Sequence, residues 1–166
     1  METIRIRGSD KKEIYEEILP QLKGLLEGER DFVANMANAS SVLRVAFPER
    51  FSWVGFYLTR GNELVLGPFQ GKPACVRIAL GNGVCGTAAV QRRAIIVPDV
   101  EQFPGHIACD PDSRSEIVVP MLRDNELIGV LDVDSNRLNE FDEMDKQYLQ
   151  QVVDILLAVS GGTSRS

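Results

Sequence analysis

The stretch between residues 75 and 134 holds all three cysteines of the chain, its one histidine and a cluster of acidic residues. Cys75 opens an apolar run, Cys85 lies in a glycine-rich turn, and Cys109 lies in a loop between two prolines. A thiolate can act as a nucleophile, ligate a metal or exchange electrons with a second thiol. Because function concentrates on loops, Cys109 is the first candidate for a reactive thiol, whereas Cys85 also suits a small buried hydrophobe.

Three carboxylates stand at the ends of strand-like runs: Glu116 begins one run, and Asp132 and Asp134 end another. Strand side chains alternate between faces, so the two aspartates point to the same face, which they share with Ile128 and Val130. In one interpretation the acids simply end a strand in solvent. In the other they hold a cationic ligand group and, with one acid protonated, donate a hydrogen bond to a ligand oxygen.

Two β-hairpins are expected to position these groups, and their strands are residues 51–58 with 63–69 and 116–122 with 127–134. In the first of these strands, alternation places Phe51, Trp53 and Tyr57 on one face and Val54 and Phe56 on the other. One face is therefore expected to belong to the core. The other, with Trp53 and Tyr57, is expected to wall a pocket.

The remaining elements follow from apolar periodicity and from the positions of Pro and Gly. Helices are expected at residues 11–27, bent or broken at Pro20, and at 32–46, 86–93 and 141–159, with further strands at 75–80 and 94–97. A long loop should reach to about residue 114, and residues 1–10 and 160–166 should be frayed. This order predicts one α+β domain over residues 1–166, with a central antiparallel sheet of about six strands flanked by helices.

Length and charge exclude several classes of protein. A chain of 166 residues with 44% hydrophobic residues supports one well-buried core. The net charge of −6 and the lack of any Lys or Arg block argue against nucleic acid and anionic membranes as partners. The chain has neither an apolar run of membrane-span length nor the core of a signal peptide. We therefore expect a cytoplasmic protein, whose odd number of cysteines argues against a secreted disulfide framework.

Two other kinds of site match part of this pattern. The run Gly81-x-Gly83-x-x-Gly86, with Asp99 downstream, imitates a dinucleotide-binding fingerprint, but the helix that follows is barely two turns long and a proline precedes the acid. The three cysteines and His106 could form a Cys₃His zinc site, but they lack the CxxC or HxxxH spacing of such sites. We interpret His106 as an exposed loop residue and expect neither a metal nor a cofactor.

Four segments of the chain resemble a GAF domain: Trp53–Tyr57, Gly83–Gly86, Pro98–Val100 and Gly129–Ser135. More narrowly, the three cysteines together with Glu116, Asp132 and Asp134 resemble the free methionine-(R)-sulfoxide reductases. This likeness extends over nearly the whole chain.

The resemblance implies an enzyme of oxidative-stress defence that reduces free L-methionine-(R)-sulfoxide to methionine. A thiolate attacks the sulfoxide, a sulfenic acid forms, and an intramolecular disulfide follows, which thioredoxin recycles. The resemblance makes Cys109 the catalytic cysteine, Cys75 the resolving cysteine and Cys85 an auxiliary thiol. It further implies a homodimer and a substrate site formed by Trp53, Tyr57, Glu116, Asp132 and Asp134.

The alternative is a non-enzymatic GAF-type sensor that binds a small ligand and signals through its helices. A sensor normally carries an output domain, for which we expect no room in this chain. Its three thiols would also have no function. Loss of thiols on incubation with free methionine sulfoxide would distinguish the reductase from the sensor.

Overall fold

The computed structural model describes residues 3–160 of the chain. Its helices are α1 (Lys11–Leu26), α2 (Phe32–Ala46), α3 (Gly83–Gln91), the short 3₁₀ helix η1 (Val100–Gln102) and α4 (Glu143–Val159). Its strands are β1 (Trp53–Arg60), β2 (Glu63–Gln70), β3 (Arg77–Ala79), β4 (Ile95–Val97), β5 (Ser115–Arg123) and β6 (Glu126–Ser135). The predicted α+β class, the six strands and both hairpins are confirmed.

The six strands form one sheet in the order β3-β2-β1-β6-β5-β4, and every neighbouring pair is antiparallel. The two predicted hairpins, β1–β2 and β5–β6, lie next to each other in the centre of this sheet. Helix α3 connects β3 to β4, which lie at opposite edges. A dinucleotide fingerprint requires a parallel βαβ unit, so the glycine motif at the start of α3 does not belong to one.

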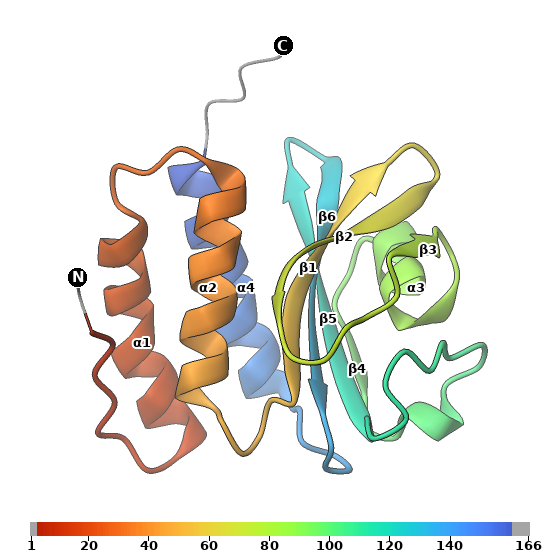
Figure 1. The fold of residues 1–166 in the computed structure, drawn as a ribbon, viewed down its shortest axis with the longest axis horizontal. Coiled ribbons are helices and arrows are strands. Elements are labelled where there is room, and N and C mark those ends of the chain that lie inside the picture. The colour runs from red at the N-terminus through yellow and green to blue at the C-terminus, as the bar shows by residue number, and fades with distance from the viewer. Residues whose placement is uncertain (1–2, 161–166) are drawn as a thin grey trace.

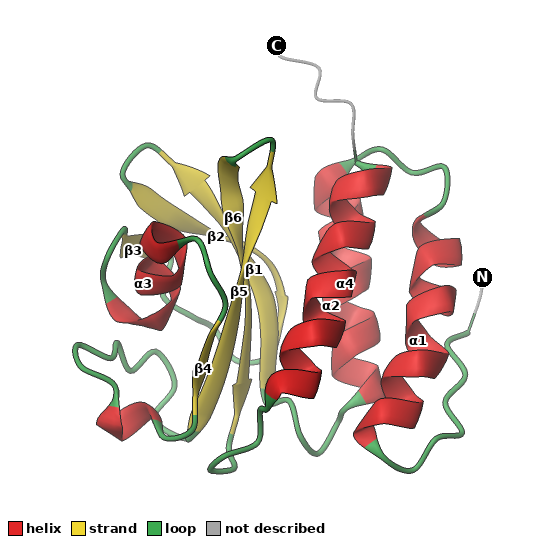
Figure 2. Cartoon of the chain, turned by 180° about the vertical axis from the view of Figure 1, so that it is seen from behind, coloured by secondary structure: helices red, strands yellow, loops and turns green. Residues whose placement is uncertain are grey.

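Helices α1, α2 and α4 cover one face of the sheet, whereas α3 and the loop after β4 lie on the other face (Figures 1 and 2). Each face has its own cluster of buried apolar side chains. Val54 and Phe56 belong to the helix-side cluster, and Trp53 and Tyr57 belong to the α3-side cluster, as the alternation along β1 predicts. Phe51 was placed wrongly: it precedes β1 and packs into the helix-side cluster, where strand alternation no longer applies.

A β-bulge corrects a second assignment. Met121 pairs with Gly129 but Leu122 pairs with Leu127, so Ile128 is an extra residue in β6. Its side chain packs against the helix-side cluster, whereas Val130 lies in the α3-side cluster. Ile128 therefore does not share the face of Val130 and the two aspartates.

Of the two alternatives at Pro20, the structure shows a single helix: α1 continues through this residue, and it begins after Asp10, whose side chain accepts a hydrogen bond from the Glu13 backbone N–H. Two other elements differ from the prediction. Strand β3 is only three residues long, so Cys75 lies in the loop before it. Helix α3 begins at Gly83, which places Cys85 in its first turn.

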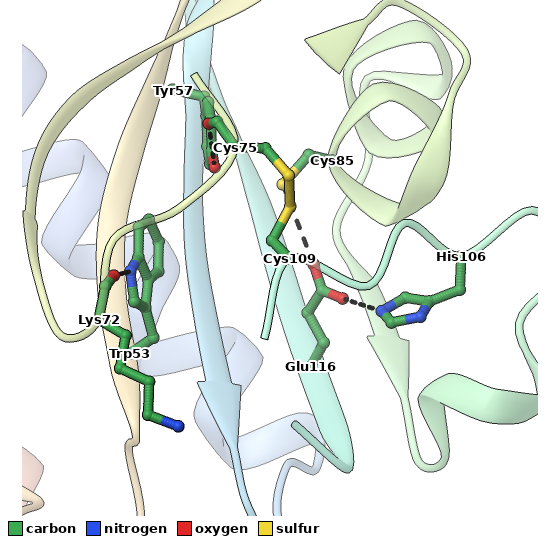
Figure 3. The surroundings of a disulfide bond; sticks show 8 residues. All are labelled: Trp53, Tyr57, Lys72, Cys75, Cys85, His106, Cys109 and Glu116. Carbon is green, nitrogen blue, oxygen red and sulfur yellow. Dashed lines mark hydrogen bonds and ion pairs between the residues drawn. A yellow bond between two sulfur atoms is a disulfide. The ribbon is translucent and has the colours of Figure 1, made fainter. Parts of the chain in front are cut away.

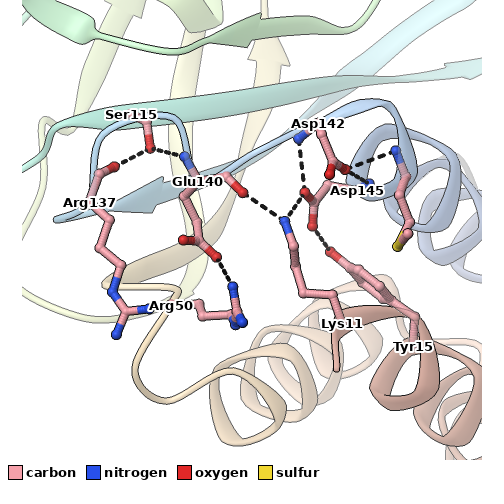
Figure 4. A network of polar contacts seen from close by, with 9 residues as sticks. Lys11, Tyr15, Arg50, Ser115, Arg137, Glu140, Asp142 and Asp145 are labelled. Atoms are coloured by element: carbon pink, nitrogen blue, oxygen red, sulfur yellow. Dashed lines mark hydrogen bonds and ion pairs between the residues drawn. The ribbon is translucent and has the colours of Figure 1, made fainter. Parts of the chain in front are cut away.

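A buried polar network holds α1 against α4 and against the segment that precedes α4 (Figure 4). The fully buried Asp145 accepts from Lys11 Nζ at 2.5 Å and from the Tyr15 hydroxyl at 2.8 Å. Arg50 pairs with Glu140 at 2.8 Å, and the Glu140 backbone N–H donates to the Ser115 hydroxyl at 3.3 Å. Because Ser115 begins β5, this network also fixes the strand end that carries Glu116.

The predicted fraying at the chain ends falls partly on residues 1–2 and 161–166, which lie outside the described residues. Residues 3–9 form no helix or strand, but the backbone N–H groups of Arg5 and Arg7 donate to Gln21 and Glu17 of α1. None of the helices among the described residues is long and apolar enough to span a membrane.

Candidate active site

A pocket lies on the α3 side of the sheet, between α3, the end of the central strands and the loop after η1 (Figure 3). Its volume is about 50 Å³. Seven of the eight residues singled out in the sequence line it, namely Trp53, Tyr57, Cys85, Cys109, Glu116, Asp132 and Asp134. The eighth, Cys75, is joined to Cys109 by a disulfide bond. The fold thus brings all eight together from segments far apart in the chain.

The aromatic wall of the pocket depends on two glycines. A Cβ at Gly55 would lie 2.5 Å from the Trp53 ring, and a Cβ at Gly71, where φ is +139°, would also lie 2.5 Å from it. The indole therefore occupies space that only glycine leaves open at these positions. It stacks on Tyr57 with ring centroids 6.0 Å apart, and its Nε1 donates to the Lys72 backbone oxygen at 3.1 Å.

The disulfide joins two loops at the edge of the pocket. Cys75 lies between β2 and β3, Cys109 lies 34 residues further on, and their Cα atoms are 5.7 Å apart. The Tyr57 hydroxyl donates to the Cys75 backbone oxygen at 3.0 Å, which fixes the Cys75 loop to β1. Since the two sulfurs are bonded to each other, they are not available in this form for the Cys₃His zinc site considered above.

Lys72 connects the same two loops electrostatically. Its Nζ lies 2.6 Å from Asp112 and 3.2 Å from Asp110, both in the Cys109 loop. Its backbone oxygen is held by Trp53 of β1. Lys72 thus holds the Cys109 loop close to the aromatic wall of the pocket.

The three acids meet at the floor of the pocket because of strand register. Glu116 pairs with Asp134 across β5 and β6, and Asp132 lies one step further along the same face of β6. Glu116 and Asp132 are each only 6% exposed, and within residues 3–160 no group forms a hydrogen bond with Asp132 Oδ1. These acids do not end a strand in solvent, so the first interpretation of them is wrong.

Burial governs the protonation of this cluster. Burial, followed by repulsion from the Asp132 charge, raises the pKa of Glu116 and of Asp134 well above the usual carboxyl range. Burial raises the pKa of Asp132 to about 6. At neutral pH the cluster therefore combines an ionised Asp132 with acids that retain protons.

Cys85 is a free thiol that faces the acids. Its Sγ lies 3.9 Å from Glu116 Oε1, at the limit of a sulfur hydrogen bond. Burial, and then the negative charges of Asp132 and Glu116, raise the pKa of this thiol well above its usual value. Cys85 is therefore protonated and a poor nucleophile as it stands.

His106 is not the exposed loop residue that we expected. Its side chain is 17% exposed, lines the pocket and places Nε2 3.9 Å from Glu116 Oε2. Burial lowers the pKa of His106, which favours the neutral imidazole. The expectation failed because the loop that carries His106 also carries Cys109, whose disulfide to Cys75 places this loop beside the pocket.

Sequence reasoning missed Lys72 and Asp110 altogether. A signal was present: Lys72 lies three residues before Cys75, and Asp110 directly follows Cys109. If the two cysteines pair, these opposite charges must come together. The family resemblance alone implies this pairing, so the residues by themselves do not predict the ion pair.

The Lys72 ion pairs lead to a first prediction. Lys72→Gln should slow closure of the disulfide by roughly threefold to tenfold, because the Cys109 loop would sample positions away from Cys75. Quenched-flow thiol counting after one turnover would measure this rate. Arg77→Gln removes another exposed ion pair, to Glu63 in the neighbouring strand, and is the matched control. An equal effect in both variants would contradict a positioning role for Lys72.

The chain is similar in sequence to a known domain family and to proteins of known name. A GAF-domain family model matches residues 31–157. "GAF domain-containing protein A" from Dictyostelium discoideum is 54% identical, over 93% of this chain and 98% of that protein. A free methionine-R-sulfoxide reductase from Escherichia coli is 46% identical, over 87% of each chain.

A solved structure of such a reductase is also similar to this chain. The free methionine-R-sulfoxide reductase from Neisseria meningitidis, determined in complex with its substrate, superposes with a TM-score of 0.94 at 47% identity and covers 97% of this chain and 96% of its own. The GAF fold and the match over nearly the full length of two such reductases agree with the pocket of thiols and acids. The chain therefore belongs to the GAF-domain family of free methionine-R-sulfoxide reductases.

Proposed function

We propose that this protein reduces free L-methionine-(R)-sulfoxide to methionine, with Cys109 as the nucleophile. The observation that carries the proposal is the Cys75–Cys109 disulfide at the edge of a pocket whose floor is formed by the buried acids Glu116 and Asp132 and the half-buried Asp134. The disulfide is the expected oxidised product of such a reaction. The acids supply the negative charge and the protons that a zwitterionic sulfoxide requires.

The pocket offers a binding group for the ammonium, the carboxylate and the S-methyl group of the free amino acid. The ionised Asp132 attracts the ammonium group, and its Oδ1 is buried without a partner. The substrate carboxylate lies toward the N-terminus of α3, where Gly83 and Val84 line the pocket and the first backbone N–H groups of the helix have no intrahelical acceptor. The S-methyl group lies against Trp53 and Tyr57.

The chemical step transfers oxygen from sulfur to sulfur. The Cys109 thiolate attacks the sulfoxide sulfur while a protonated acid, Glu116 or Asp134, gives a proton to the sulfoxide oxygen. The S–O bond breaks, methionine leaves, and Cys109 carries the hydroxyl as a sulfenic acid. The Cys75 thiol then attacks the Cys109 sulfur, which releases water and forms the disulfide.

A dithiol donor must then reduce the disulfide, and thioredoxin fits this role because it exchanges thiols with accessible disulfides. Such a cycle requires a reducing compartment, which supports a cytoplasmic location. The family resemblance supports a homodimer, which light scattering after gel filtration would test.

The deciding experiment compares three substrates: the free R-epimer, the free S-epimer and a peptide that contains methionine sulfoxide. We expect thioredoxin-dependent turnover of the free R-epimer and at least about a hundredfold lower kcat/KM for the peptide, since an amide-linked methionine lacks the ammonium that the acids hold. Equal rates on peptide and free amino acid would contradict the proposed mode of binding. Binding with no loss of thiols would favour the sensor instead.

A further inference from the structure

The floor of the pocket holds a set of side-chain atoms of the kind that bind metal ions, in addition to their proposed part in the reaction. Cys85 Sγ, a carboxylate oxygen of Glu116 and a carboxylate oxygen of Asp132 all lie within 4.8 Å of one another, and all three residues are buried. They come from the first turn of α3 and from two paired strands, so the backbone holds them rigidly. Asp132 Oδ1 is buried and has no hydrogen-bond partner among the residues that the structure describes.

This cluster lacks a fixed positive charge among the described residues. Lys72, the basic residue that lines the pocket, is paired with Asp110 and Asp112. His106 Nε2 approaches Glu116 only to 3.9 Å. The ionised Asp132 is a buried charge without a cation beside it, which is unfavourable. The site therefore attracts a cation whenever no substrate ammonium fills it.

The donor set decides which cation fits. Mg²⁺ and Ca²⁺ prefer oxygen ligands throughout, but here a thiol sulfur stands beside two carboxylates. One sulfur and two oxygens suit Zn²⁺ or Cd²⁺, with water or the nearby His106 Nε2 as a fourth ligand. In a tetrahedral zinc site, donors lie about 3.3 to 3.8 Å apart, so side-chain movements of about 1 Å would close the set around an ion.

We propose that Cys85, Glu116 and Asp132 form a binding site for a thiophilic divalent cation such as Zn²⁺. The ion occupies the place of the substrate's ammonium group. Binding releases the protons of Cys85 and Glu116 to solvent and forms one metal–thiolate bond and two metal–carboxylate bonds, with no change of oxidation state. Insofar as the proposed function holds, Zn²⁺ is then a competitive inhibitor with respect to methionine sulfoxide, and a chelator reverses the inhibition.

The first test uses the oxidised protein, in which the disulfide leaves Cys85 as the free thiol. Titration with Co²⁺ should give a thiolate-to-metal charge-transfer band that saturates at one Co²⁺ per chain. Zn²⁺ should abolish the band by displacing Co²⁺. Cys85→Ser should lose the band, and Asp132→Asn should weaken binding at least about tenfold. Glu143→Gln, which changes an exposed acid on α4, should leave it unchanged. Retention of the band and of full Zn²⁺ affinity in Cys85→Ser would overturn the proposal.

The second test uses the variant Cys75→Ser/Cys109→Ser, which cannot perform the redox chemistry and retains Cys85. Free methionine sulfoxide should weaken Zn²⁺ binding in calorimetric titrations in proportion to its own occupancy. If the sulfoxide binds but does not affect Zn²⁺, the two do not share a site and the inference is wrong. If Zn²⁺ binds through Cys85 but the sulfoxide does not bind at all, the metal site stands and the proposed function fails.

Discussion

Cys109→Ser should abolish reduction of free methionine-R-sulfoxide, with a loss of at least about 10⁴-fold in the chemical step. Serine cannot supply a thiolate, and no other thiol of the chain replaces it: Cys75 is tied to β1 through the Tyr57 hydroxyl, and burial among carboxylates raises the pKa of the Cys85 thiol. Chromatographic quantification of methionine formed in a single turnover would measure this loss.

Cys75→Ser should separate chemistry from recycling. Attack on the sulfoxide needs only Cys109, so this variant should release up to one methionine per chain and then stop, with a sulfenic acid that dimedone traps. Cys85→Ser is the matched control, because it removes a thiol from the same pocket that lies outside the disulfide. It should retain turnover with thioredoxin. Full turnover by Cys75→Ser, with none by Cys85→Ser, would transfer the resolving role to Cys85.

The sequence predicted the parts of the site that depend on strand alternation. A side-chain period of two places Asp132 and Asp134 on one face, and it places Trp53 and Tyr57 opposite Val54 and Phe56. The same rule failed at Phe51, which lies before its strand. It failed again at Ile128, where a bulge adds one residue to β6.

Features that depend on contacts between loops could not be predicted in this way. The position of His106 and the Lys72 ion pairs depend on the approach of two loops whose cysteines are 34 residues apart in the chain. Local patterns do not encode such long-range closure. The predicted start of α3 is also three residues late, because glycines such as those before Cys85 are typical of a turn, whereas the helix begins at Gly83.

Asp134→Asn should lower activity and raise stability at the same time. Asparagine can donate a hydrogen bond to the sulfoxide oxygen but cannot deliver a proton, so the chemical step should slow by about 10²-fold to 10³-fold. The folded protein, however, no longer holds a carboxyl whose pKa burial and the Asp132 charge raise. Removal of this unfavourable group should increase the free energy of unfolding near pH 7 by on the order of 1–2 kcal/mol.

The sign of the pH dependence follows from the same shifts. Acids whose pKa is raised in the folded state bind more protons there than in the unfolded chain, so the free energy of unfolding falls as pH rises. For Asp132 this fall extends from about pH 4, the ordinary value of an aspartate, to its folded pKa of about 6. Urea titrations should therefore find the wild type more stable at pH 5 than at pH 7.5, with a smaller difference in Asp134→Asn.

Glu16→Gln provides the control for both measurements. Glu16 is an exposed acid on α1, and its hydrogen bond to Lys12 lowers the pKa of its carboxyl, so its replacement should leave activity unchanged and stability no higher. An Asp134→Asn protein with wild-type single-turnover rates and no gain in stability would mean that Asp134 neither transfers a proton nor strains the fold. The opposite signs expected for activity and stability test a specific physical claim: the pocket keeps unfavourable buried acids because the reaction needs their protons.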